Sequence, residues 1–235
     1  MEKFGKVIVK LRIPILILSF LLLIPSAIGY FNTRVNYDIL YYLPNEIETM
    51  QGQDILMDDF NKGAYAMVVV QNMDTKSTDR LIKKVENVDH VAQVISYTGI
   101  VGEDVPSEIV PSKFRKYFEN DSTDTTLFAI FFDNTTSSDD TMNAIIQIRE
   151  QTEGQAFISG MSAVVTDTKN LSEKETPLYV LIAVVLVCIV LAIFMDSFLV
   201  PVFFMISIGM AIVYNLGSNI LLGEVSYITL SLIHI

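Results

Sequence analysis

Long stretches without a charged residue constrain the fold of this chain more than any other feature. The first covers residues 13–33, and its core reads IPILILSFLLLIPSAIGYF. Two more follow late in the chain, at residues 177–195 and 198–222. About 20 apolar residues are enough for a helix to cross the roughly 30 Å of hydrocarbon in a bilayer. The sequence therefore predicts three transmembrane helices at these positions.

A shorter apolar run covers residues 225–235. Its length is about half of what a spanning helix needs. We expect it to be the truncated start of a fourth transmembrane helix, so that the chain stops inside an element. Whether residues 231–235 (SLIHI) are native sequence stays open.

Charge is distributed unevenly along the chain. Residues 1–12 form a basic head, with Lys3, Lys6, Lys10 and Arg12 against one glutamate. Basic residues before a transmembrane helix favour a cytoplasmic amino terminus. We therefore expect the head in the cytoplasm of a cell-membrane protein and residues 34–176 on the extracytoplasmic side. The alternative is a cleaved signal peptide, because a basic head and an apolar run that ends in small residues fit that pattern too.

All but three of the 27 acidic residues lie between residues 32 and 176, and the whole chain carries a net charge of −11. Nucleic-acid-binding proteins need a basic patch, so we expect no nucleic acid among the partners. The bilayer is the first partner that the sequence predicts.

Between the first and second apolar stretches the pattern changes to short apolar strands and amphipathic helices. Predicted strands cover residues 64–71, 90–97, 125–133 and 155–160, and predicted helices lie at residues 77–87 and 138–153. This β-α-β, β-α-β order is typical of a split βαβ, ferredoxin-like domain. Further helices are expected at residues 48–61, 111–119 and 161–176, with a kink or a new helix start at Pro177.

No catalytic constellation is present, so we expect no enzyme. The phosphate-binding glycine motif, GxSxG and HExxH are all missing from the sequence. The one cysteine, Cys188, and the two histidines, His90 and His234, predict neither disulfides nor a metal site. We expect no cofactor. The paired carboxylates at residues 58–59 and 139–140 are interpreted as solvated helix surface.

Polar residues inside the third apolar stretch are the remaining candidates for a site: Ser207, Asn215 and Asn219, together with Ser218. Polar groups in hydrocarbon commonly pair with a neighbouring helix. The alternative is a polar path for a substrate or an ion across the membrane. No charged residue lies in the middle of a predicted span, so the sequence offers no proton-relay carboxylate.

Two segments connect this layout with a known family. Residues 36–44, NYDILYYLP, follow the first helix, and residues 217–229, GSNILLGEVSYIT, lie where the third helix ends and the fourth begins. Both segments, and the order of one helix, an external α/β domain and further helices, resemble the amino-terminal half-repeat of the MMPL branch of the resistance-nodulation-division (RND) superfamily.

The resemblance implies export of hydrophobic, amphiphilic or lipid-like compounds, driven by the proton motive force. It implies that residues 34–176 form a porter-type domain through which substrate passes. It also implies a relay aspartate on the fourth helix and a second copy of the repeat as the partner of this one. Neither is present in this sequence, so we expect no transport by these residues alone, and homo-oligomerisation stays open.

Two other functions fit the same layout. The SecDF type of protein-export component shares one helix followed by an external domain. A membrane-anchored module that senses or binds an envelope ligand is the second alternative.

Overall fold

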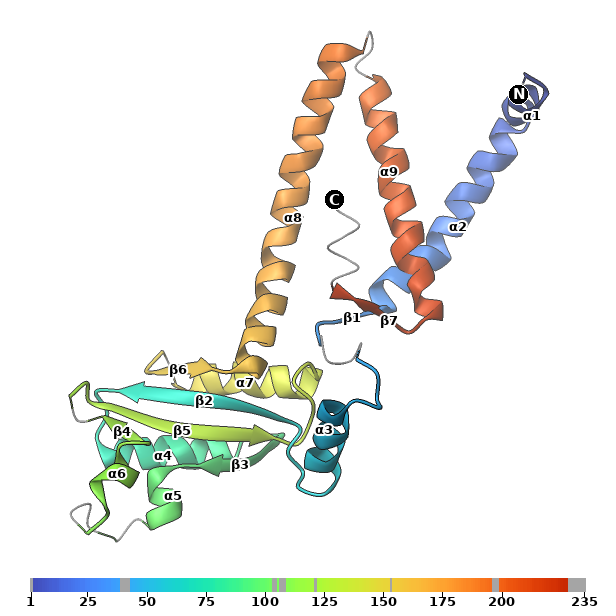
Figure 1. Cartoon of the computed structure of the whole chain (residues 1–235). Helices are drawn as coiled ribbons and strands as arrows, with labels where there is room; N and C mark the ends of the chain where they lie inside the picture. The colour runs from blue at the N-terminus through green and yellow to red at the C-terminus, as the bar shows by residue number, and fades with distance from the viewer. Residues whose placement is uncertain are drawn as a thin grey trace. The chain divides into compact units, whose positions relative to one another are not determined.

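The computed structural model describes residues 2–38, 43–102, 105, 109–120, 122–152, 154–195 and 199–227. The chain divides into two compact units. One combines Met1–Tyr37 with Glu173–Ile235 and holds the apolar helices; the other is Asp38–Ser172. Figure 1 shows the elements of each unit.

The helical unit begins with α1 (Glu2–Lys10) and α2 (Arg12–Asn32) and ends with α9 (Leu199–Ser218) and the short 3-10 helix η2 (Asn219–Leu221). Between them comes α8 (Met161–Phe194), which starts in the other unit. Within the described residues, three helices are long and apolar enough to span a membrane: Arg12–Asn32, Met161–Phe194 and Leu199–Leu221. Each overlaps one of the three predicted apolar stretches; that these helices cross a membrane stays a prediction.

No new helix starts at Pro177, one of the two predicted outcomes, because α8 runs through this residue without a break. Proline has no N–H, so the carbonyl group of Glu173 loses its helical partner. Glu173 is exposed, and water can bind the freed carbonyl oxygen. A proline is therefore tolerated at this point inside a continuous helix.

The segment after η2 also differs from the prediction. Residues 225 and 226, expected at the start of a fourth helix, belong to the strand β7 (Glu224–Ser226), which pairs in parallel with β1 (Arg34–Asn36). Tyr227 is helical. The rest of the predicted fourth helix, residues 228–235, lies outside the described residues, as do Asp196–Phe198 and residues 39–42.

The second unit holds α3 (Glu48–Asp58) and then strands and helices in alternation. In chain order these are β2 (Ala64–Gln71), α4 (Thr75–Glu86), β3 (Val91–Ile95), α5 (Tyr97–Val101), α6 (Ser112–Arg115), β4 (Glu119–Asn120), β5 (Thr125–Phe132), α7 (Asp139–Thr152) and β6 (Ala156–Ser159). The four predicted strands and the two main helices all form, with shifts of a few residues at their ends.

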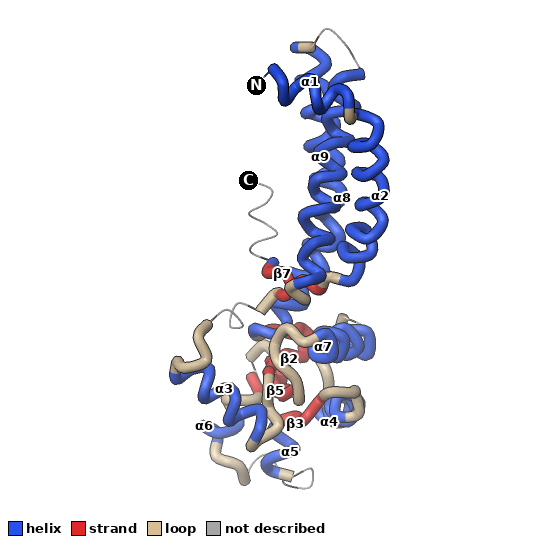
Figure 2. The backbone as a smooth tube through the Cα atoms, turned by 90° about the vertical axis from the view of Figure 1, so that its right-hand side faces the viewer, coloured by secondary structure: helices blue, strands red, loops and turns tan. Residues whose placement is uncertain are grey.

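The sheet has the order β3-β5-β2-β6, and every neighbouring pair is antiparallel. The helices that follow β2 and β5, α4 and α7, lie on the same side of the sheet (Figure 2). Along β2, alternate residues are buried and partly or fully exposed, as the period of two in a strand requires. One face of the sheet is therefore packed and the other is open.

The packed face forms the core of this unit. It joins valine side chains of β2 and aromatic side chains of β5 to apolar residues of α4 and α7: Val68, Val70, Phe128, Phe132, Leu81, Val85, Ile145 and Ile148. All of them are buried. Burial of about this many large apolar side chains, at roughly 1.5–3 kcal/mol each, accounts for the separate compactness of the unit.

A charged cap starts α4. The Asp74 carboxylate accepts a hydrogen bond from the Ser77 backbone N–H at 3.1 Å. The side-chain hydroxyl of Ser77, and after it this backbone N–H, lower the pKa of Asp74. A carboxylate whose pKa is lowered by folding stabilises the fold above its unfolded pKa and loses that effect as the pH falls through its folded pKa.

Replacing Asp74 by alanine should therefore lower the midpoint of thermal unfolding near neutral pH, and the difference from wild type should shrink on acidification. Circular dichroism of the chain in detergent micelles measures both effects. Asp54→Ala, on the exposed surface of α3, serves as the control and should show neither. A difference that grew as the pH fell would contradict the capping role.

Candidate functional site

Small residues let α2 and α9 cross at very short range (Figure 1). Gly29 of α2 and Gly217 of α9 are both buried. A Cβ atom built on Gly217 would lie 2.1 Å from the Ser26 carbonyl oxygen, and one built on Gly29 would lie 2.2 Å from the Gly217 carbonyl oxygen. Close backbone approach at glycine is a common way to pack transmembrane helices.

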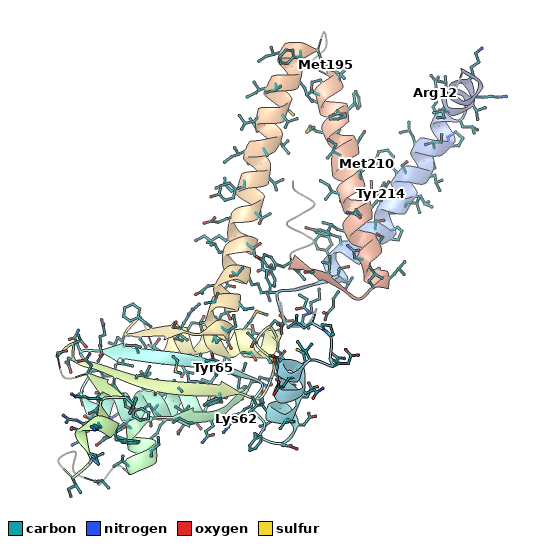
Figure 3. All side chains as sticks on the ribbon, viewed as in Figure 1. Arg12, Lys62, Tyr65, Met195, Met210 and Tyr214 are labelled. Atoms are coloured by element: carbon teal, nitrogen blue, oxygen red, sulfur yellow. The ribbon has the colours of Figure 1, made fainter. Side chains whose placement is uncertain are left out.

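A tyrosine adds a polar contact at this crossing. The Tyr214 hydroxyl donates a hydrogen bond to the Ser19 carbonyl oxygen of α2 at 2.5 Å, and Figure 3 marks its position on α9. The sequence interpretation missed Tyr214, although it directly precedes Asn215 in the polar part of the third apolar stretch. In this structure its phenol supplies a hydrogen bond between the two helices.

The three predicted path residues do not meet. The Ser207 hydroxyl donates to the Phe203 carbonyl oxygen of its own helix at 2.9 Å. Asn215 is exposed, and its carbonyl oxygen accepts from the Ser218 hydroxyl. Asn219 is half-buried at the start of η2. A polar path through these residues stays a prediction.

The two segments singled out in the sequence come together beyond the ends of α2 and α9. Their strands pair with Arg34 opposite Glu224, Val35 opposite Val225 and Asn36 opposite Ser226. We call this parallel pair of β1 and β7 the β1–β7 junction. Residues about 190 positions apart in sequence thus share backbone hydrogen bonds, which short sequence patterns alone cannot predict.

Side chains reinforce the junction around one carboxylate. Glu224 accepts a hydrogen bond from the Asn36 side-chain amide at 2.8 Å and lies 3.4 Å from the Arg34 guanidinium. Asn36 is buried, whereas Arg34 and Glu224 remain partly exposed. The ring of Tyr37 stacks on that of Tyr227, with centroids 5.3 Å apart. The junction therefore has a polar side and an aromatic side.

The open face of the sheet is apolar. Three side chains of β2 face three of β5 across the strand pair, and one of β6 extends the row: Tyr65, Met67, Val69, Phe131, Ala129, Leu127 and Phe157. None of them is buried, and Tyr65 and Phe157 expose 48% and 60% of their surface. We call this row the open-face strip. The Lys62 ammonium group lies 5.2 Å from the centre of the Phe131 ring, and Figure 3 labels Lys62 and Tyr65.

An exposed contiguous apolar patch of this kind marks an interaction or binding surface more often than a monomer's ordinary surface. The single strands were predicted, but the strip depends on the pairing of three strands, and the pairing is seen only in the structure.

Within the described residues, no group of three or more histidine, cysteine, aspartate or glutamate side chains could hold a metal ion. His90 lies 3.2 Å from Asp133 and 3.8 Å from Asp140, in a partly exposed group. Cys188 is a half-buried free thiol on α8, and His234 lies outside the described residues. The Asp139 carboxylate of the second predicted pair bonds Lys169 at 2.9 Å, which is a surface contact.

Comparison with known proteins identifies the family. A model of the MMPL family matches residues 42–235, which include β7 and the segment before it. A search of curated proteins finds no match. The matched region also contains two of the three helices that can span a membrane. The chain therefore belongs to the MMPL family, a family of RND-type membrane transporters and not of enzymes.

Proposed function

We propose that this protein exports hydrophobic, amphiphilic or lipid-like compounds across the cell membrane, driven by proton entry. The open-face strip is the observation that carries the substrate class. A row of exposed aromatic, methionine and aliphatic side chains across three strands can bind an acyl chain or a flat apolar ring without selecting one exact shape. A soluble metabolite would gain little on such a surface.

The proposed orientation places the basic head in the cytoplasm and the domain of residues 34–176 outside. This domain then acts as a porter-type domain. In the sheet, β5 lies between β2 and β3, the two strands of the first βαβ unit, and β2 lies between β5 and β6, the two strands of the second. This strand order supports a ferredoxin-like fold.

The β1–β7 junction suggests how movement of helices reaches the porter-type domain. The polypeptide runs from α2 through β1 into that domain, and β7 is followed directly by Tyr227. In this proposal a displacement at Tyr227 moves β7, and the paired strands pass it on to β1.

A transport assay tests the proposal with the complete gene product in inverted membrane vesicles. A fluorescent amphiphile should accumulate when a proton gradient is imposed, and a protonophore should abolish the accumulation. Gradient-independent movement, or none, would contradict proton-driven export. Uptake of an unfolded secretory polypeptide, with no effect on the amphiphile, would favour the SecDF-type alternative.

Met67→Glu tests the strip itself. A carboxylate in the centre of the strip should reduce amphiphile accumulation strongly, because burying a charge against an apolar ligand is costly. Gln71→Glu is the matched control: it adds the same charge on the same face of β2, at the exposed end of the strand. Equal transport by both variants would remove the strip from the substrate route.

A further inference from the structure

The outer face of α4 is positively charged, although the domain around it is rich in acidic residues. Four exposed cations share this face: Lys76, Arg80, Lys83 and Lys84. Each of the three lysines lies three or four residues from Arg80, the spacing of neighbours on one side of a helix. The opposite side of α4 packs into the core. Like charges at this spacing repel each other, and a bound anion would relieve the repulsion.

Two of these cations line an open cavity of about 260 Å³. Its walls come from α4, the end of α7 and the turn that follows α7, on the helix-covered side of the sheet (Figure 2). They carry two cations, two side-chain amides and two hydroxyl groups: Arg80, Lys84, Gln151, Gln155, Ser77 and Thr152. The partly buried Met73 adds an apolar surface. A concave space with a few convergent polar groups is typical of a small-molecule site.

The cations and amides of this cavity are accessible from solvent. Arg80, Lys84, Gln151 and Gln155 are all exposed. None of these four side chains takes part in a hydrogen bond or a salt bridge with another described residue. The Asp74 carboxylate attracts Arg80 at longer range, and no carboxylate of a described residue lines the cavity. The cavity therefore offers hydrogen-bond donors and positive charge that nothing described here neutralises at close range.

The two hydroxyl groups do not add donors. The Ser77 hydroxyl bonds the Asp74 carboxylate, and the Thr152 hydroxyl donates to the Arg149 carbonyl oxygen at 3.0 Å. The available donors are thus the two cations on α4 and the two amides on the other wall. A ligand that meets both walls needs acceptor oxygens that point in more than one direction. A carboxylate has two oxygens in one plane, whereas a phosphate group has three terminal oxygens and up to two charges.

We propose that this cavity binds the phosphate group of an organic phosphate. Arg80 and Lys84 neutralise its two charges and donate hydrogen bonds to its oxygens, as is usual for phosphate in proteins. The amides of Gln151 and Gln155 donate from the other wall, and Met73 contacts the organic part. A soluble organic phosphate and a phospholipid headgroup share this chemistry.

The site rests on no part of the proposed export function, since none of its lining residues belongs to the open-face strip. A bound phosphate would join α4 to the end of α7 and oppose their separation. Binding should therefore raise the unfolding temperature of the domain, because a ligand that binds only the folded state stabilises it.

Calorimetric titration of the full chain in micelles of an uncharged detergent tests the proposal. The probes are glycerol 3-phosphate and dihexanoylphosphatidic acid, with glycerol and acetate as controls. At least one phosphate should bind, and the tighter of the two identifies the source as soluble or lipid. Glycerol should not bind, and acetate should bind at least about tenfold more weakly because it meets fewer donors. Binding of neither phosphate, or equally tight binding of acetate, overturns the proposal.

Lys84→Gln and Arg80→Gln place the ligand in the cavity. Each should lower phosphate affinity at least about tenfold, and neither should lower the ligand-free unfolding temperature, because each removes like-charge repulsion on α4. Lys76→Gln is the matched control: it makes the same change of charge on the same exposed face of α4 but outside the cavity lining. It should change affinity less than about twofold. Equal losses in Lys76→Gln and Lys84→Gln, or no loss in Lys84→Gln, would contradict a site in this cavity.

Discussion

Replacing Gly217 by alanine is expected to separate α2 from α9 and to lower the stability of the helical unit by about 1–3 kcal/mol, the usual cost of overpacking. The new Cβ atom would lie 2.1 Å from the Ser26 carbonyl oxygen and 2.7 Å from its carbon atom. These are backbone atoms of a helix, so no side-chain rotation relieves the clash. The helices themselves have to move.

Gly209→Ala supplies a control on the same helix. A Cβ atom at Gly209 meets nothing within 4 Å, and alanine favours a helix over glycine by roughly 0.5–1 kcal/mol. The two substitutions make the same chemical change and should shift stability in opposite directions. Thermal unfolding in micelles, followed by circular dichroism, gives the sign of each change.

A distance measurement shows whether the helices separate. Spin labels at Leu18 and Val202, both exposed, in a Cys188→Ser background, report the spacing of α2 and α9. The label distance should increase in Gly217→Ala and stay unchanged in Gly209→Ala. If Gly217→Ala were as stable as wild type with an unchanged distance, the close crossing would not exist in the protein.

Much of the architecture followed from the sequence, since its signals are local. Uncharged runs of spanning length have few alternatives to a membrane helix, and the valine-rich run of residues 64–71 predicted β2 with its bounds correct. The sequence left two outcomes open at Pro177, a kink or a new helix start, and the structure excludes the second, because α8 continues through the proline. A continuous helix is tolerated there because the freed carbonyl group belongs to the exposed Glu173, and that exposure cannot be read from the sequence.

The candidate site was harder to predict, because it depends on pairing across long distances. Residues 225 and 226 look like part of an apolar helix, yet an available strand partner at Val35 and Asn36 makes them a strand. Helix and strand cannot be distinguished by periodicity in so short a run. The open-face strip likewise combines residues from separate strands.

Glu224→Ala is expected to loosen the β1–β7 junction and to cost about 1.5–3 kcal/mol, the range for a hydrogen bond to a charged group. The carboxylate accepts from the buried Asn36 amide at 2.8 Å. The contact between Glu224 and Arg34 is longer at 3.4 Å and partly exposed. Exposed ion pairs contribute roughly 0.2–1 kcal/mol. Arg34→Ala should therefore cost much less than Glu224→Ala.

Glu224→Gln distinguishes the hydrogen bond from the charge. Glutamine keeps an oxygen that can accept from Asn36 but carries no charge to attract Arg34. The loss of unfolding free energy in Glu224→Gln should be close to the loss in Arg34→Ala. The double variant should lose little more than either single variant. Unfolding in micelles gives the four free energies of this cycle.

Equal losses for Glu224→Gln and Glu224→Ala would mean that charge, and not the Asn36 bond, stabilises the junction. In the transport assay, Glu224→Ala should reduce amphiphile accumulation more than Glu224→Gln, because the paired strands transmit movement only while the junction remains closed.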